Sequence, residues 1–235
     1  MSVQPKGTTF YKPEVDTIFE LGGQDAKFTS LRDGFLVDFR MNKVCAAGTG
    51  SFLEETAKKL GISISGEYES LAMAAKTPLK LAERCAVYME SDLMSQLQMG
   101  VGHEDLLAGL SRAVVHNYLN RVVQDGKIGE IISFQGGPSL NKSVVAAFEA
   151  VIGKPVLTLQ HREVIGAIGA ALHALEEVEM RRNVDPGYVS KFKGWDIIAK
   201  NFSHSEEICY RTPNCHNQCK LQVYTIGEEE AVYGG

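Results

Sequence analysis

Two cysteines of this chain stand directly ahead of segments with helical spacing, a position in which a thiol can do chemistry. Cys45 is followed by a glycine-rich turn and then by apolar residues at helical intervals. Ser51 and Glu54 have the spacing of a capping box, so we expect a helix to begin near Gly50 or Ser51. Cys85 precedes a second stretch with helical spacing. The positive end of a helix dipole favours thiolate, the form that binds a metal or attacks an electrophile.

A glycine pair follows the first predicted strand and suits contact with a phosphate-bearing ligand. Gly22 and Gly23 come directly after a buried strand expected over residues 16–21, and Gln24 and Asp25 follow them. A tight turn that carries an amide and a carboxylate can approach a phosphate or a hydrated Mg²⁺. A plain hairpin turn explains the same four residues equally well. The motif alone leaves both interpretations open.

A second glycine pair, Gly136 and Gly137, follows another buried strand, expected over residues 128–134. These glycines can lie against a base or a ribose. Gly166 opens a later predicted helix, where it allows close approach of a backbone or a ligand. From this strand onward, the expected elements follow one another as strand, helix, strand and helix. This order is typical of an α/β fold, in which ligands bind at the carboxyl ends of the strands. The elements expected after the glycine pair are a helix over 141–152, a strand over 156–159 and a helix over 164–180.

Three further cysteines, Cys209, Cys215 and Cys219, are close in sequence and have His216 among them. Three thiols at such spacing can bind Zn²⁺ or a second iron–sulfur cluster. A small cysteine-containing knuckle without a metal is the alternative. For Cys45 and Cys85, the alternative is that they are inert buried thiols.

The composition is that of an ordinary globular protein. The chain has 235 residues, of which 44% are hydrophobic and 23% charged, and a net charge of -5. Mild acidity without a basic run argues against nucleic acid as a partner, and no apolar stretch approaches the roughly 18 residues that a membrane span needs. The N-terminus has no apolar signal region, so we expect a cytoplasmic protein. In a cytoplasmic protein, an odd number of cysteines favours metal ligands or free thiols over disulfides.

The remaining pattern divides the chain into four parts. Residues 1–15 show little pattern and are expected to form a tail. Residues 16–180 form the main lobe, which includes a hairpin over 26–31 and 35–40 and an amphipathic helix over 104–123. Residues 181–205 are expected to be a linker. Residues 206–235 form a cysteine-containing segment with a strand over 221–226.

In combination, five motifs resemble a known family. They are FELGGQDAK at 19–27, MNKVCAAGTGSFLEE at 41–55, RC at 84–85, FQGGP at 134–138 with Asn141, and GAIGAA at 166–171. The chain is similar to the activators of 2-hydroxyacyl-CoA dehydratases and the related ATPase subunits of benzoyl-CoA reductases. The resemblance implies an α/β fold of the actin, hexokinase and Hsp70-like (ribonuclease H-like) ATPase superfamily, with inserted helices and a small cysteine-containing appendage.

The resemblance also implies roles for the nucleotide-site residues. Gly22 and Gly23 would belong to the second phosphate loop, in which Gln24 and Asp25 orient water and Mg²⁺ for hydrolysis of ATP to ADP. The other nucleotide contacts would be Gly136, Gly137, Asn141 and Gly166.

For the thiols, the resemblance implies that Cys45 and Cys85 are ligands of a [4Fe–4S] cluster that bridges a homodimer. Two thiols from each of two chains supply the four that such a cluster commonly needs. The implied activity is ATP-dependent transfer of a low-potential electron. The implied partners are an acyl-CoA dehydratase or reductase component as acceptor, and reduced ferredoxin or flavodoxin as donor.

One departure from the family pattern concerns the other phosphate loop, typically Gly-x-Asp-x-Gly-Ser-Thr, which does not precede Ile18. The chain is therefore expected to be the C-terminal part of an activator that is truncated at both ends and inactive alone as an ATPase. Two other classes compete. A small-molecule kinase lobe leaves the paired cysteines unexplained, and a non-enzymatic scaffold would use Cys209, Cys215 and Cys219 to hold structural zinc.

Overall fold

The computed structural model describes residues 3–43, 46–210, 215–227 and 229–234. The chain forms two compact units, Met1–Met180 and Arg181–Gly235. Within the described residues, the first unit holds a five-stranded sheet and the second a three-stranded sheet. The first unit carries both glycine pairs and Cys85, and the second carries the three C-terminal cysteines.

The sheet of the first unit has the strand order β3-β2-β1-β4-β5. Strands β1 to β3 form an antiparallel meander, whereas β4 pairs parallel to β1 and β5 pairs parallel to β4. Because Glu20 of β1 lies opposite Gln135 of β4, the segments that follow these two strands leave the sheet at the same edge. The strands are β1 (Thr17–Leu21), β2 (Ala26–Arg32), β3 (Phe35–Met41), β4 (Ile132–Gln135) and β5 (Val156–Leu157).

The predicted first strand and the hairpin that follows β1 are confirmed. Every residue of β1 is buried, as expected of a central strand that is covered on both faces. Glu20 is buried in this strand and forms an ion pair with Lys27 at 2.9 Å, which compensates its charge. Asp33 and Gly34, with φ of 51° and 77°, form the tight turn between β2 and β3.

A strand is present where one was predicted over 128–134, but the predicted start is wrong, because β4 begins only at Ile132. The backbone N–H groups ahead of it bond to side chains rather than to a neighbouring strand. Gly129 N–H donates to Thr17 Oγ1 at 2.8 Å, and the N–H groups of Glu130 and Ile131 donate to one carboxylate oxygen of Asp16. A segment bonded in this way cannot join the ladder.

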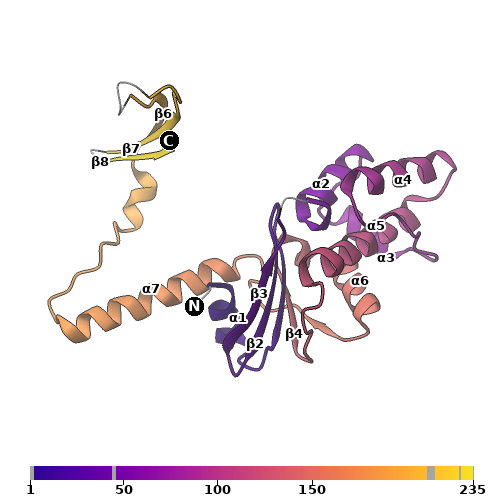
Figure 1. Ribbon diagram of the computed structural model, residues 1–235, viewed down its shortest axis with the longest axis horizontal. Coiled ribbons are helices and arrows are strands. Elements are labelled where there is room, and N and C mark those ends of the chain that lie inside the picture. The colour runs from indigo at the N-terminus through magenta and orange to yellow at the C-terminus, as the bar shows by residue number, and fades with distance from the viewer. Residues whose placement is uncertain (1–2, 44–45, 211–214, 228, 235) are drawn as a thin grey trace. The chain divides into compact units, whose positions relative to one another are not determined.

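Helices α2 to α6 lie on one side of the sheet, as Figure 1 shows, with α4 packed on α5. The predicted helix over 104–123 is confirmed as α5, continued by a short π-helix, Leu119–Val123, in place of a regular last turn. Its Tyr118 meets Phe148 of α6 edge-on at 5.5 Å, and Phe148 in turn stacks on Phe19 of β1 at 5.1 Å. The helices are α2 (Gly50–Lys59), α3 (Glu67–Met73), α4 (Ala86–Gln98), α5 (His103–Tyr118) and α6 (Lys142–Ile152).

The other face of the sheet is covered by α1 (Val3–Tyr11) and the first part of α7 (Ile165–Val184), as Figure 1 also shows. The expectation of a patternless tail over 1–15 is therefore wrong for α1. This helix buries small residues instead of an apolar stripe. A Cβ on Gly7 would lie 2.3 Å from the carbonyl oxygen of Ile165, and Thr8 Oγ1 donates to Gln135 Oε1 at 2.9 Å.

The second unit contains strands β6 (Phe202–Ile208), β7 (Lys220–Ile226) and β8 (Glu229–Gly234), paired antiparallel in that order. The predicted strand over 221–226 is confirmed as β7. Ahead of the sheet lies a short 3-10 helix, Trp195–Ala199, within the segment that was expected to be a linker. Val223 is the hydrophobic residue that this unit buries among the described part of the chain.

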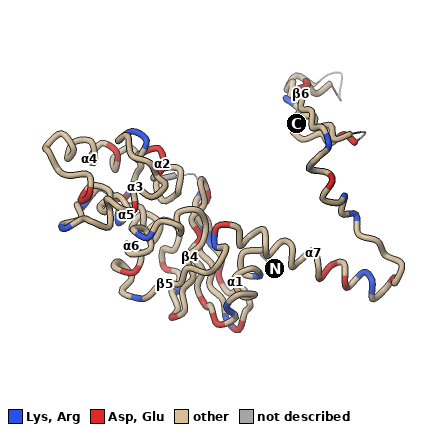
Figure 2. Tube along the Cα trace, turned by 180° about the vertical axis from the view of Figure 1, so that it is seen from behind, with Lys and Arg blue, Asp and Glu red and all other residues tan. Residues whose placement is uncertain are grey.

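Charged residues of both signs are interspersed along the chain, as Figure 2 shows. Among the described residues, none of the helices is both long enough and apolar enough to cross a lipid bilayer.

Candidate functional site

The two glycine pairs meet at the carboxyl ends of neighbouring strands. Gly136 follows β4 with φ of +93°, a backbone conformation that favours glycine. A Cβ at this position would lie 1.9 Å from the carbonyl oxygen of Leu21, the last residue of β1. Gly136 therefore allows the turn after β4 to pack directly against the turn after β1, and this contact lies behind the lining residues Gly23 and Gly137.

The turn Gly22-Gly23-Gln24-Asp25 joins β1 to β2, so it is a hairpin turn and also borders the site. Gly22 N–H donates to the carbonyl oxygen of Asp25 at 2.7 Å, which closes the turn. Gly23 lines a cavity next to it. The side chains of Gln24 and Asp25 are exposed and do not line this cavity. They lie on the rim of the hairpin, where solvent reaches them.

The start of α2 is bonded to this turn. The N–H groups of Gly50 and Ser51 donate to the carbonyl oxygens of Gly22 and Gly23, each at 2.8 Å. The predicted helix start near Gly50 or Ser51 is confirmed, but the capping box is wrong, because Thr49 is the N-cap residue and makes no side-chain capping bond. The Gly23 carbonyl oxygen accepts from the Ser51 N–H, which the Glu54 side chain of a capping box was expected to satisfy.

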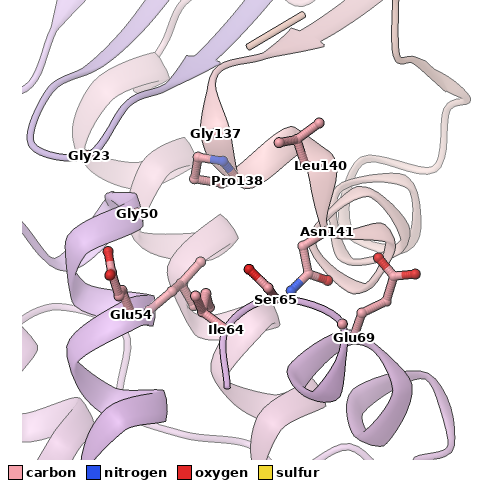
Figure 3. Close-up of a pocket in the computed structure, with 12 residues that line it drawn as sticks. Gly23, Gly50, Glu54, Ile64, Ser65, Glu69, Gly137, Pro138, Leu140 and Asn141 are labelled. Carbon is pink, nitrogen blue, oxygen red and sulfur yellow. The ribbon is translucent and has the colours of Figure 1, made fainter. Parts of the chain in front are cut away.

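A cavity of about 450 Å³ lies between the two glycine turns, α2, and the loop before α3 (Figure 3). Gly23, Gly50 and Gly137 contribute lining without side chains, Glu54 follows Gly50 one turn later in α2, and Glu69 lies across the cavity from them (Figure 3). The absence of side chains on the three glycines leaves room for a bulky ligand. The lining residues are Gly23, Gly50, Leu53, Glu54, Ile64, Ser65, Gly66, Glu69, Gly137, Pro138, Leu140 and Asn141.

Asn141 offers this cavity an unused hydrogen-bond donor. Its side-chain oxygen caps α6 by accepting from the Ser143 N–H at 2.9 Å and from Ser143 Oγ at 2.7 Å. Its amide nitrogen is buried and has no partner among the described residues. Figure 3 shows this nitrogen turned toward Ser65. A buried donor without a partner costs free energy unless a ligand or water accepts from it, so the cavity fits a ligand that carries acceptor atoms.

Three polar residues line the cavity but were not predicted from the sequence as site residues: Glu54, Ser65 and Glu69. Glu69 is held in place by the N–H of Lys142, which donates to its Oε2 at 2.8 Å. Carboxylates in such a place accept hydrogen bonds from hydroxyl groups of a ligand. The signal in the sequence that could have indicated Ser65 is the glycine next to it, Gly66. Its φ of +81° forms the sharp turn that brings Ser65 to the cavity.

Gly166 lies apart from the residues that line this cavity. It is in the first turn of α7, where a Cβ would lie 2.9 Å from the side-chain nitrogen of Gln4 in α1. Its role as a nucleotide contact stays a prediction. The cavity brings together Gly23, Gly137 and Asn141, with Gly22 and Gly136 directly behind them in the two turns.

Cys85 is the N-cap residue of α4, as its spacing predicted, and its side chain makes no capping bond. The thiol is free and partly exposed. Val87 and Tyr88 in the first turn of α4 are 71% and 69% exposed, so apolar surface lies beside it. A partly exposed thiol at an uncapped helix start fits one ligand position of a metal cluster. Cys45 lies outside the described residues.

The three C-terminal cysteines belong to the second unit. Cys209 N–H donates to the carbonyl oxygen of Cys219 at 2.8 Å, which extends the pairing of β6 with β7. Cys209, Cys215 and Cys219 are free thiols. Within the described part of the chain, no group of three or more His, Cys, Asp or Glu side chains is arranged to hold a metal ion. The second metal site therefore stays a prediction.

A family model described as the BadF/BadG/BcrA/BcrD ATPase family matches residues 1–174. A 2-hydroxyisocaproyl-CoA dehydratase activator of Clostridioides difficile is 33% identical over 180 residues, which cover 76% of this chain and 67% of that protein. The (R)-2-hydroxyglutaryl-CoA dehydratase activating ATPase of Acidaminococcus fermentans is 33% identical over 177 residues, which cover 75% of this chain and 67% of that protein.

Among solved structures, the activator of the 2-hydroxyisocaproyl-CoA dehydratase from Clostridium difficile with bound ADPNP superposes with a TM-score of 0.74. Its sequence is 31% identical, and the match covers 80% of this chain and 70% of that one. With the observed sheet, these matches confirm the expected fold class, an α/β lobe of the actin-like ATPase fold.

Proposed function

The chain belongs to the BadF/BadG/BcrA/BcrD ATPase family, and from this premise we propose that it is part of an ATP-dependent activator of an acyl-CoA dehydratase or of a benzoyl-CoA reductase-like enzyme. The observation that carries the proposal is the cavity over the two glycine turns, into which Asn141 directs an unused donor. Helix α2 bonds to one of these turns and follows Cys45 in the chain. Cys45 and the start of α2, which borders the proposed nucleotide site, are therefore close together along the chain.

In the proposed nucleotide site, the walls without side chains receive the nucleotide and the polar residues orient it. Asn141 donates to an acceptor atom of the ligand. Glu54 and Glu69 accept hydrogen bonds from the hydroxyl groups of the nucleotide, since both residues line the same cavity. Gln24 and Asp25, at the exposed end of the hairpin turn, orient water and Mg²⁺.

In the proposed thiol site, Cys45 and Cys85 of one chain join the same two cysteines of a second chain around a symmetry axis. A bound [4Fe–4S] cluster supplies one-electron transfer at low potential. The backbone N–H groups at the start of α4 follow directly on Cys85, and they stabilise the negative charge of its thiolate. The exposed Val87 and Tyr88 suit an interface that excludes water around this site.

The proposed partners follow from this activity. An acyl-CoA dehydratase or reductase component accepts the electron, and reduced ferredoxin or flavodoxin supplies it, which places the protein in the cytoplasm. Cys209, Cys215 and Cys219 would hold Zn²⁺ or a second cluster separately from this reaction.

The nucleotide part of the proposal is tested with Asn141→Asp. Aspartate keeps the oxygen that caps α6 but removes the amide donor, so thermal stability should be kept while binding of ADP with Mg²⁺ weakens. Titration calorimetry of the wild type and the variant measures both dissociation constants. Equal affinities, or no binding by the wild type, would contradict the nucleotide site.

The thiol part is tested by strictly anaerobic purification, followed by iron and sulfide analysis and by mass measurement in solution. A dimer should contain about two irons per chain, because four irons are shared by two chains. Cys45→Ser and Cys85→Ser should both lose this iron, while Cys209→Ser, a matched change in the second unit, should retain it. An iron-free monomer would overturn the electron-transfer role. Zinc without iron, lost in Cys209→Ser, would favour the scaffold alternative.

A further inference from the structure

Asn117, near the end of α5, holds the backbone directly ahead of Cys85. The residue is 2% exposed. Its side-chain nitrogen donates to the carbonyl oxygen of Glu83 at 2.6 Å and to that of Arg84 at 3.3 Å. These two residues precede Cys85 without a regular helix or strand of their own. One buried amide therefore satisfies two consecutive carbonyl groups of a loop that has no other regular structure.

The other side of Asn117 meets the segment that follows Cys45. A short 3-10 helix, Ala46–Gly48, begins one residue after this cysteine. A Cβ on Gly48 would lie 3.0 Å from Asn117 Oδ1 and 3.4 Å from the backbone nitrogen of Tyr118. A side chain at position 48 would therefore be tighter than an ordinary contact, and the neighbouring atoms of α5 would have to shift to admit it. Asn117 thus lies between the segment after Cys45 and the segment before Cys85.

We propose that Asn117 is a positioning residue: it holds residues 83–84, directly ahead of Cys85, against residues 46–48, and so fixes the place from which the Cys85 thiol binds a metal group. This inference rests on the proposed function. The physical reason is that a metal site needs its ligands held by surrounding hydrogen bonds rather than by the metal alone. If the amide is removed, the carbonyl groups of Glu83 and Arg84 lose the donor that ties them to α5, and the segment before Cys85 is no longer held there.

The decisive variant is Asn117→Asp, which preserves the volume of the side chain but turns an oxygen toward both carbonyl groups. Asn117→Ala removes the donor altogether. Asn120→Ala is the matched control, because Asn120 lies one turn further on and contacts the same Glu83, but only through its exposed carboxylate, at 3.3 Å. Gly48→Ala approaches Asn117 from the opposite segment and covers the case in which Asn117→Ala does not fold.

The first readout needs no metal. In the reduced, metal-free protein, alkylation of Cys85 is followed by mass spectrometry of its peptide. We expect it to be several-fold faster in Asn117→Asp and Gly48→Ala than in the wild type and Asn120→Ala. Equal rates in all four proteins, with thermal transitions that show them folded, would overturn the inference.

The second readout uses the iron-loaded protein and a chelator. Iron should leave the Asn117 variants several-fold faster than the wild type and Asn120→Ala, and their electron paramagnetic resonance spectra should differ from that of the wild type. The two proposals can fail separately. A wild type that binds no iron contradicts the proposed function, while the alkylation rates still decide the role of Asn117. Iron retention and alkylation that are both unchanged in the variants would reject Asn117 alone.

Discussion

Two adjacent glycines at the end of β4 are constrained in different ways. Gly136 has φ of +93° and no space for a Cβ beside Leu21, whereas a Cβ on Gly137 meets nothing within 4 Å and would project into open space at the cavity wall. We therefore expect Gly136→Ala to lower the free energy of unfolding by at least about 2 kcal/mol. Gly137→Ala should leave stability nearly unchanged and weaken nucleotide binding. Urea unfolding and calorimetry measure the two effects.

Each of the two variants is the control for the other, because both add the same methyl group at adjacent positions. If Gly137→Ala lost stability as much as Gly136→Ala, the backbone rather than the cavity would explain both. If Gly137→Ala bound ADP as the wild type does, the cavity would not be the nucleotide site.

The residues of the site could be predicted where a local pattern marks them. Gly136 and Gly137 follow a buried strand and were predicted from that position, and Asn141 was predicted from the family resemblance. Glu54 and Glu69 were missed, since each reaches the cavity only because α2 and α3 pack beside the glycine turns. No spacing in the sequence encodes that approach. Asn117 was missed for the same reason, since its partners are more than thirty residues away along the chain.

At the scale of elements, Asp105 joins the first turn of α5 to the loop that follows α3. Its carboxylate accepts from the N–H groups of Lys76 at 3.0 Å and Thr77 at 2.8 Å, and from Thr77 Oγ1 at 3.0 Å. The hydrogen bond from the Thr77 backbone is the main reason that the pKa of Asp105 lies below its ordinary value of 3.8, while partial desolvation opposes it. The carboxylate form is thus the form that the fold favours.

This depressed pKa predicts how the stability of the Asp105→Asn variant depends on pH. The stabilisation is present at pH values above 3.8, where the unfolded chain is also ionised, and it is lost as the pH falls through the lower pKa of the folded state. The wild type should therefore be more stable than Asp105→Asn at neutral pH, and the difference should shrink in acid. Urea unfolding at a series of pH values measures it. A difference that does not change with pH would contradict the role of the charge.

The contact between α1 and α7 gives a second prediction at this scale. A Cβ on Gly169 would lie 1.8 Å from the carbonyl oxygen of Val3, whereas one on Gly166 would meet only the movable end of Gln4. Gly169→Ala should separate the helices and lower the free energy of unfolding by about 1 to 3 kcal/mol, while Gly166→Ala should cost less. Amide hydrogen exchange over residues 3–11 should rise in Gly169→Ala alone. Unchanged protection there would show that α1 is not held by this contact.

The elements that were predicted correctly are marked by a pattern in their own sequence, such as an apolar stripe or a turn motif. The elements that were missed form only through contacts with other parts of the chain. The helix α5 shows an apolar stripe, and the hairpin of β2 and β3 has its Asp33-Gly34 turn. The helix α1 contains Pro5 and Gly7 and buries small residues, which no hydrophobic period reveals. Strands β6 and β8 are mostly exposed and become strands by pairing on both sides of β7.

At the scale of the whole molecule, the second unit has very little core. Val223 is buried, but the other described hydrophobic residues of its sheet are partly or fully exposed. A sheet this small commonly needs a metal or a disulfide for independent stability. We therefore expect rapid amide exchange in β6 and β7, residues 202–208 and 220–226, in the metal-free protein and slower exchange after addition of Zn²⁺. Hydrogen exchange measured by mass spectrometry compares the two states.

Cys219→Ser is the control for this experiment, because it removes one candidate ligand and keeps a side chain of similar size. Zinc should then protect the sheet much less. If zinc protects neither protein, or protects both equally, the three cysteines do not form a metal site in this chain. The first unit, residues 3–180, should show the same exchange in all four samples.

The bonds of Gly50 and Ser51 to the glycine turn, and the contact of Gly48 with Asn117, occupy neighbouring positions of one short segment. Two binding equilibria that act on the same few peptide groups share a coupling free energy, and such coupling is reciprocal. Whatever factor a nucleotide contributes to metal affinity at the thiols, the metal must contribute to nucleotide affinity. A calorimetric titration with ADP, made with and without iron, would therefore measure the same coupling free energy as the affinity for iron measured with and without ADP.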